Sequence, residues 1–359
     1  MSSNFRDAGG QRGAALIVAL VVVLLVVLLA TRLSSDYLVL FRTVENQSEL
    51  QQARAYLRGA ELVAEQALLR DLQRSGDIDS ALEPWAQRAS LPLPEGIMSA
   101  CLADLQGRLN LNDLGAPDGE MSAAQKRFVR LLQVVDTTLD SVAATTLANA
   151  VFDWLDADDT QRYPGGAEAI DYGRLPQPYR AANQAFASVS ELRLVQGFDG
   201  ALVAALTPHL SVWGNGNLNI NTLDAQLSPR ATSATNAGLA PDAGPVMLRI
   251  LNAPDSLLPL SIEGARLLAS ARGERGLFEN LDVFAAPPFD VQQWDLDGIA
   301  MNSAYFELTA VMQTGSRSHV MQSVLRRAVL PSGVPEVTVV SRRHAGAQQG
   351  GSSCAAALP

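Results

Sequence analysis

The residues of this sequence that are best suited to chemistry are acidic and lie close together. Six carboxylates occur between positions 153 and 171, namely Asp153, Asp156, Asp158, Asp159, Glu168 and Asp171. Hard cations such as Ca²⁺ take about six to eight oxygen ligands, which several carboxylates on one loop can supply. A bound cation would fold a long loop whose charges otherwise repel one another. On the residues alone, a solvated acidic loop is the simpler interpretation.

The spacing within this loop does not fit an EF-hand. Asp156 and Asp158 match the first two ligand positions of that motif. Gln161 stands where the motif needs glycine, and Glu168 comes one residue too late. The alternatives that remain are a calcium loop of another kind and a loop without metal.

The sequence offers little else for catalysis. Its three histidines, His209, His319 and His344, are scattered, and none lies in an HExxH motif. The paired carboxylates leave a metal-dependent hydrolase as an alternative, but no pattern supplies a general base or oxyanion donors. The formal net charge of −10 argues against a nucleic-acid partner, because phosphate contacts need clustered lysine and arginine. We therefore predict a protein that is not an enzyme.

The two cysteines, Cys101 and Cys354, have no CxxC spacing, and no histidine cluster lies near them, which argues against a zinc site. If the domain is exported, a disulfide between them is chemically allowed. Two unpaired thiols are the alternative.

The elements that must position these residues begin with a membrane segment. Residues 14–30 are an unbroken apolar run, and with its flank this run approaches the roughly twenty residues that cross a bilayer. A polar leader precedes it and ends in Gly13, so a cut there would leave the apolar helix on the mature chain, unlike a secretory signal peptide. We predict a leader over 1–13, one transmembrane helix over 14–33 and the remaining chain outside the cytoplasm.

Beyond the membrane segment, apolar residues recur three or four positions apart, as in an amphipathic helix. We expect one helix from residue 14 to about residue 70, with an apolar stripe that packs on a sheet. The stripe comprises Leu50, Ala53, Leu57, Ala60, Ala64 and Ala67.

Two β-rich pieces flank a long helical stretch. Alternation predicts a strand over 97–104 that forms a short hairpin with 109–112, and a second hairpin from strands over 305–311 and 318–325. Helical patterns cover 123–135, 138–156 and 190–206. Residues 186–205 resemble a helix-hairpin-helix or SAM-like unit, which we interpret as scaffold because Asp199 lies in its turn and lysine is absent.

The economical arrangement is an α+β fold: a long N-terminal helix packed on a small antiparallel sheet, with a large inserted α-helical domain. The predicted parts are 34–114 and 301–330 for the α/β domain, 115–300 for the inserted α-domain and 331–359 for a flexible tail.

The leader resembles a class III, type IV pilin-like leader, since Gln11-Arg12-Gly13 is followed directly by the apolar run from Ala14. The resemblance implies that a prepilin peptidase cleaves after Gly13 and that Ala14 becomes an N-methylated N-terminus. The fifth mature position is Val18, where pilins of this class carry glutamate that is proposed to pair with a neighbour's N-terminal amine. A subunit without that glutamate fits best at the end of a filament.

The mature chain as a whole resembles the K-type minor pseudopilins of type II secretion (general secretion pathway protein K). The segments that carry the resemblance are 151–156 with 166–168, 186–192, 218–222 and 303–306. It implies a single-pass protein of the bacterial inner membrane whose periplasmic domain forms the tip of the pseudopilus, initiates its assembly and supports export of folded proteins.

The resemblance also implies partners and a metal. The partners are the I-type and J-type minor pseudopilins, the major pseudopilin filament and prepilin peptidase, and we expect contacts on the helix stripe at Leu50, Leu57 and Ala64. The metal is a structural Ca²⁺ held by Asp156, Asp158, Glu168 and Asp171. Two alternatives remain, a membrane-anchored periplasmic metal-dependent enzyme and a type IV pilus minor pilin. The insertion and Val18 count against the second.

Overall fold

The structure is a computed structural model that describes residues 10–74, 78–115, 119–224, 244–273, 275–315 and 317–345. It divides into two compact units, Met1–Tyr56 and Leu57–Pro359. The first unit consists of most of helix α1, which spans Gly10–Arg74. Its apolar window has a mean hydropathy of 3.3, and none of that window is buried. By length and composition α1 can cross a membrane, and the predicted span over 14–33 lies within it.

In the second unit, the end of α1 buries the predicted stripe. Leu57 has no exposed surface, and Ala60 and Ala64 are 3% and 5% exposed; the last buried position is Leu68 in place of the predicted Ala67, which is half-buried. Because Leu57 and Ala64 are covered within their own domain, the prediction that they contact partner subunits is wrong. Apolar side chains that do face solvent on this part of α1 are Leu62 and Val63, which are 62% and 68% exposed.

Two ion pairs fix this part of α1 to the sheet. Arg342 donates two hydrogen bonds to Glu61, one of them from Nε at 3.1 Å. Arg327 donates from Nη1 to Asp71 at 3.0 Å. Both arginines come from the last two strands of the sheet, so charge pairing sets the position of α1 where apolar contact alone would let it slide.

Among the described residues, five strands form the main sheet in the order β1-β2-β7-β8-β9, and every neighbouring pair is antiparallel. Their bounds are Ala89–Leu93, Gly96–Asp104, Tyr305–Thr314, Arg317–Val329 and Pro335–Ala345. β2 pairs directly with β7, although residues 105–304 separate them along the chain. The intervening residues are therefore an insertion between two neighbouring strands.

The prediction that strand 97–104 pairs with 109–112 is wrong. β2 instead forms a hairpin with β1, which the sequence analysis did not identify. Leu109–Asn110 is a short strand, β3, that pairs in parallel with β4, Leu210–Ser211. β1 is an edge strand, where proline is tolerated because no ladder hydrogen bond is lost, and this explains how Pro92 fits within it.

The prediction of a flexible tail over 331–359 is also wrong for its first part. β9 pairs with β8 along its length, with a bulge at Val324/Leu325. The prediction failed because the bulge interrupts the alternation of the strand and because β9 is a half-exposed edge strand with little apolar signal. Residues 346–359, including Cys354, lie outside the described residues, so the disulfide with the buried Cys101 of β2 stays a prediction.

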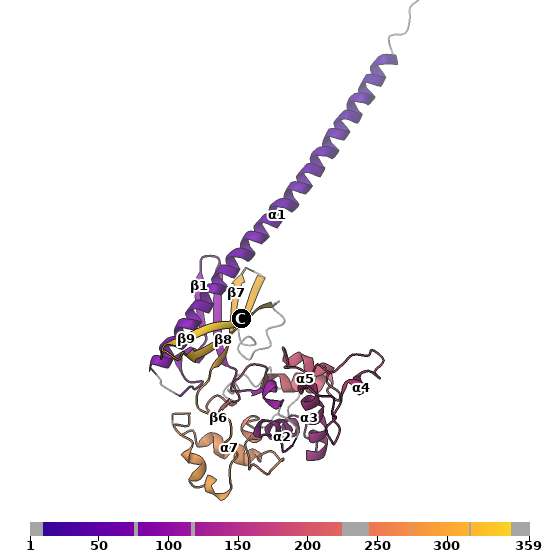
Figure 1. Ribbon diagram of the computed structural model, residues 1–359. Coiled ribbons are helices and arrows are strands. Elements are labelled where there is room, and N and C mark those ends of the chain that lie inside the picture. Colours follow the sequence, from indigo (N-terminus) through magenta and orange to yellow (C-terminus); the bar gives the residue numbers. More distant parts are fainter. Residues whose placement is uncertain are drawn as a thin grey trace, which may run out of the picture. The chain divides into compact units, whose positions relative to one another are not determined.

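The insertion is mainly helical and has its own apolar core. Its α-helices, α2, α3, α5 and α7, gather together in Figure 1 with the one-turn helix α4. The bounds are Ala123–Val135, Ser141–Leu155, Gly200–Leu206 and Ile262–Ser270, with α4 at Ala169–Tyr172. Of the short 3₁₀ helices, η1, Pro84–Ala86, precedes β1, and η2 to η7 within the insertion span Leu111–Leu114, Val189–Leu194, Thr207–His209, Leu248–Ile250, Asp282–Ala285 and Phe289–Val291. Strands β5, Leu218–Asn219, and β6, Ile299–Ala300, pair in parallel.

Caps explain where the insertion's helices begin. Ser122 and Gln125 form a reciprocal capping box at α2. Asp199 accepts the N–H of Leu202 at 2.7 Å and caps α5. The predicted helix over 190–206 is interrupted at Gly197, whose φ of +87° a side chain would strain. Asp199 is thus a helix cap, as the scaffold interpretation of this unit requires.

One buried carboxylate joins the sheet to the insertion. Asp104, the last residue of β2, accepts hydrogen bonds from Ser303 Oγ at 2.6 Å, from Asn219 Nδ2 at 3.2 Å and from the hydroxyl of Thr222. Burial raises the pKa of Asp104, and these donors oppose the rise. The donors lie in the segments 218–222 and 303–306, so these two segments close the insertion onto the sheet.

Candidate functional site

The first candidate feature is the start of α1. Gly13 and Ala14 lie in its first turns, and Val18 follows with 62% of its side chain exposed. The aliphatic side chains from Leu16 to Leu29 are all about half exposed or more. A helix that leaves such a surface uncovered requires an apolar environment, which a bilayer or neighbouring helices supply.

The second candidate feature is the acidic loop between α3 and α4. Asp153 is completely buried, and the backbone N–H of Arg162 donates to its Oδ2 at 3.2 Å. The guanidinium of Arg162 lies 3.6 Å from Asp153 Oδ1 and 3.4 Å from Asp156 Oδ2. Burial raises the pKa of Asp153 to about 6, with a further rise from Asp156, while Arg162 opposes it. One arginine therefore holds the two carboxylates at the end of α3.

Glu168, the N-cap residue of α4, is the least compensated carboxylate of this loop. Glu168 is 4% exposed, and its carboxylate faces the backbone N–H groups in the first turn of α4 but makes no hydrogen bond of ordinary geometry among the described residues. Burial raises the pKa of Glu168 to about 7, and Asp153 and Asp156 raise it further. A buried carboxylate without well-formed hydrogen bonds is costly unless a cation or a proton neutralises it.

The other two predicted ligands lie further out. Asp158 is exposed, and the N–H of Thr160 donates to it at 2.7 Å, which lowers the pKa of Asp158. Asp171 Oδ2 accepts the N–H of Glu168 at 3.1 Å. The structure thus brings Asp156 and Glu168 toward Asp153, but it does not gather the four predicted residues around one point.

The ligand types of these residues suit a hard cation, although among the described residues only Asp71, Asp79 and Glu83 bring three carboxylates within 4.8 Å of one another. Glu168 offers two buried oxygens without hydrogen bonds of ordinary geometry, and Asp153, Asp156 and Asp158 add carboxylates of the kind that Ca²⁺ prefers. Asp153 belongs to the acidic cluster of the sequence but is not among the four predicted ligands. Its position in the last turn of a largely apolar helical pattern was the available signal. Gly166 is also needed here, because a Cβ on it would lie 2.0 Å from Asp153 Oδ2.

Aromatic packing holds the two ends of the acidic loop together. The ring of Trp154 on α3 meets that of Tyr172 on α4 edge to face, with centroids 5.3 Å apart, and Tyr172 stacks on Tyr179 at 5.2 Å. These contacts bring the ends of the loop together without help from its charges.

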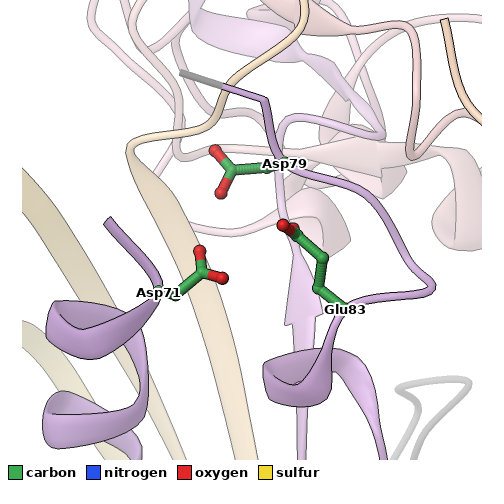
Figure 2. Close-up of side chains that lie close together, drawn as sticks. All are labelled: Asp71, Asp79 and Glu83. Carbon is green, nitrogen blue, oxygen red and sulfur yellow. The ribbon is translucent and has the colours of Figure 1, made fainter. Parts of the chain in front are cut away.

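The third candidate feature is a cluster of carboxylates at the end of α1 and in the segment before β1, where the sequence predicted none. Figure 2 shows Asp71, Asp79 and Glu83 pointing toward one another, and their oxygen atoms approach within 4.8 Å. Arg327 already binds both aspartates, and Glu83 accepts the N–H of Ser80 at 2.8 Å. Burial, helped by Glu83 and Asp79, raises the pKa of Asp71 to about 6. Because a guanidinium occupies the position of the cation, we interpret this cluster as structural.

An apolar N-terminal helix whose continuation packs on an antiparallel sheet defines a pilin-like subunit, and an α-domain between two neighbouring strands marks a particular kind. Residues 107–215 match the family model described as type II secretion system (T2SS), protein K. Protein K of Pectobacterium carotovorum is 33% identical over 222 residues, which cover 59% of this chain and 67% of the relative. Protein K of Pseudomonas aeruginosa is 29% identical over 328 residues, which cover 89% of each chain.

A solved structure shares the fold. It is the crystal structure of the GspK–GspI–GspJ complex from enterotoxigenic Escherichia coli, with a TM-score of 0.66, 25% identity and coverage of 84% of this chain and 99% of the matched chain. The chain belongs to the type II secretion system protein K family, and it is a minor pseudopilin of type II secretion. The predicted fold class, the family resemblance and this role are confirmed.

Proposed function

We propose that this chain forms the tip of the pseudopilus together with an I-type and a J-type minor pseudopilin, and that this complex initiates assembly of the major pseudopilin filament. The observation that carries the proposal is the α-domain inserted between β2 and β7. A further subunit stacked beyond this one would have to clear that domain. Val18 supports the same conclusion, because the chain cannot offer a carboxylate to the amine of a subunit added beyond it. The matched GspK structure was solved in complex with GspI and GspJ.

We infer that leader cleavage and membrane anchoring precede assembly of the pseudopilus. Prepilin peptidase would cleave after Gly13, Ala14 would be methylated, and the apolar part of α1 would hold the subunit in the inner membrane with the main domain in the periplasm. Leu62 and Val63 are the exposed apolar side chains of the second unit's part of α1 that neighbouring subunits would cover. The role is structural and non-enzymatic.

For the acidic loop we propose a structural Ca²⁺ held by Asp156, Asp158, Glu168 and Asp171, with Asp153 close by. When bound, the ion would neutralise the surplus of negative charge in the loop. Glu168 supports this proposal most strongly, because it buries two carboxylate oxygens that make no hydrogen bond of ordinary geometry in the described residues.

The tip position can be tested by counting copies. Sheared pseudopili from cells that overproduce this chain should contain it at a low ratio to the major pseudopilin, whatever its expression level. Val18→Glu alone should leave that ratio low, because the insertion still blocks addition of a further subunit. Val18→Glu with residues 105–304 replaced by an Asn-Gly turn should raise the ratio. A wild-type ratio that rises in proportion to expression would refute the tip position.

The complex and the leader have their own tests. Wild-type chain should co-purify with the I-type and J-type subunits, and Leu62→Arg should weaken that co-purification. Intact mass from cells with and without prepilin peptidase should show a start at Ala14 only when the peptidase is present. An identical start in both would contradict the leader assignment.

A further inference from the structure

A cleft of about 450 Å³ lies between the sheet and the inserted domain, away from the acidic loop. One wall comes from β7, β8 and β9, on the face opposite the one where Arg327 and Arg342 meet α1. The other wall comes from η3, α5, β4 and the residues that follow β4. The cleft therefore forms only where the insertion meets the sheet.

A buried amide in this cleft has nothing to donate to. Gln322 on β8 is 3% exposed and lines the cleft. Its Oε1 accepts a hydrogen bond from Arg343 Nε at 2.8 Å, which fixes the orientation of the amide. Its Nε2 has no hydrogen-bond partner among the described residues. An unsatisfied buried donor costs about 1–3 kcal/mol, so this position favours an acceptor supplied from outside.

The charges in the cleft point to the same kind of ligand. The side chain of Arg108 is 13% exposed, and its Nη1 lies 3.6 Å from Glu307 Oε2, too far for a hydrogen bond. Arg108 Nε also lacks a hydrogen-bond partner within the described chain. Arg343 lies 3.9 Å from the same Glu307, and Arg193 adds a third guanidinium from η3. Three arginines thus face one glutamate, in a chain whose net charge is −10.

We propose that this cleft binds the carboxylate of a peptide, with an adjacent apolar side chain, from another protein chain. Guanidinium and amide donors suit the two oxygens of a carboxylate. Leu105, Val203, Leu210, Val324 and Trp213 supply an apolar lining beside the arginines. Glu307 disfavours a doubly charged phosphate in the same place. The proposal does not depend on the position of the subunit in the filament.

The test uses the full chain in detergent micelles. Acetyl-Ala-Ala-Leu with a free carboxylate is titrated against its C-terminal amide, and binding is followed by calorimetry and by tryptophan fluorescence. We expect the acid to bind with a dissociation constant of about a millimolar or tighter, and the amide about tenfold more weakly. Trp213→Phe should abolish most of the fluorescence change, which places the ligand in the cleft. N-acetyl-leucine, which has the same carboxylate on a single residue, should bind more weakly than the tripeptide.

Variants separate the site from general charge. Arg193→Met, at an exposed position that does not endanger folding, should weaken binding of the acid about fivefold or more. Gln322→Leu removes the buried donor and should also weaken binding of the acid. Arg275→Met is the matched control, because Arg275 is exposed, pairs with Glu279 and lies outside the cleft. Equal affinity for acid and amide, or full affinity in Arg193→Met, would overturn the proposal. Equal affinity for N-acetyl-leucine and the tripeptide would overturn the proposal that the ligand is a peptide.

Discussion

Replacing Glu168 by glutamine should have opposite effects on stability with and without calcium. The substitution keeps the shape of the side chain but removes the buried charge. The pKa of Glu168 is raised from its ordinary 4.5 to about 7, and this gap corresponds to about 3 kcal/mol at about 1.36 kcal/mol for each pH unit. Because solvent screens part of the interaction with the neighbouring carboxylates, we expect about 1–2 kcal/mol of it to appear in the free energy of unfolding.

The pH dependence follows from the sign of that shift. The folded chain keeps the proton of Glu168 at pH values where the unfolded chain has lost it. Without calcium, the wild-type protein should therefore lose stability as the pH rises from about 4.5 to about 7. Glu168→Gln should reduce this slope and make the calcium-free protein about 1–2 kcal/mol more stable than wild type at about pH 8.

Calcium should reverse the order of stability, so that wild type becomes more stable than Glu168→Gln. Saturating calcium at about a hundred times its dissociation constant stabilises a folded protein by about 2.7 kcal/mol, and Glu168→Gln should lose most of that gain. Urea unfolding of the full chain in detergent, with EDTA or with excess calcium, measures both effects. Glu120→Gln, which removes one exposed carboxylate before α2, is the matched control and should change neither. Loss of stability in Glu168→Gln under EDTA, or an undiminished calcium gain, would refute the reasoning.

Three further substitutions test the remaining structure. Asp104→Ala removes a buried carboxylate that accepts four hydrogen bonds, from Gln106, Asn219, Thr222 and Ser303, and urea unfolding should show a loss of about 3 kcal/mol. Arg327→Met removes the guanidinium that pairs with the buried Asp71 and Asp79 and should cost about 3–5 kcal/mol, whereas Arg326→Met, on the exposed neighbour, should change the free energy of unfolding little. Leu62→Arg should leave the free energy of unfolding within about 0.5 kcal/mol of wild type while it weakens co-purification with the I-type and J-type subunits. A midpoint lowered in Leu62→Arg as much as in Asp104→Ala would mean that Leu62 belongs to the core.

Much of the fold was predictable because its signals are local. The apolar run and the three-or-four spacing at Leu57, Ala60 and Ala64 define α1 without knowledge of any other element. The hairpin of β7 and β8 has a glycine with φ of +57° at Gly315, so its turn is readable from the sequence. The helical insertion was predictable because the spacing of apolar residues changes from two, as in strands, to three or four between the two β-rich pieces.

The failures share a different cause, which is dependence on distant partners. β1 and β9 are edge strands, and their residues form strands only because β2 and β8 offer a free edge. The same holds for the acidic loop. In the sequence Glu168 looks like any of the six carboxylates, and only the packing of α4 against α3 through Trp154 and Tyr172 buries it, as the fold also buries Asp153. Burial is a property of the fold, so the sequence could indicate the acidic loop but not which of its carboxylates is buried with the least compensation.

The connection at Asp104 explains why a large insertion can have a mechanical role. β2 and β7 are hydrogen-bonded neighbours, so the two ends of the insertion leave the sheet about 5 Å apart. Such a narrow connection would act as a hinge if only the two chain ends crossed it. Asp104 instead binds donors from both the start of the return path and the middle of the insertion, at Ser303 and Asn219. A domain fixed in this way keeps its orientation on the sheet when subunits added at the base of the filament push on the pilin-like domain. The end of a growing filament requires this property.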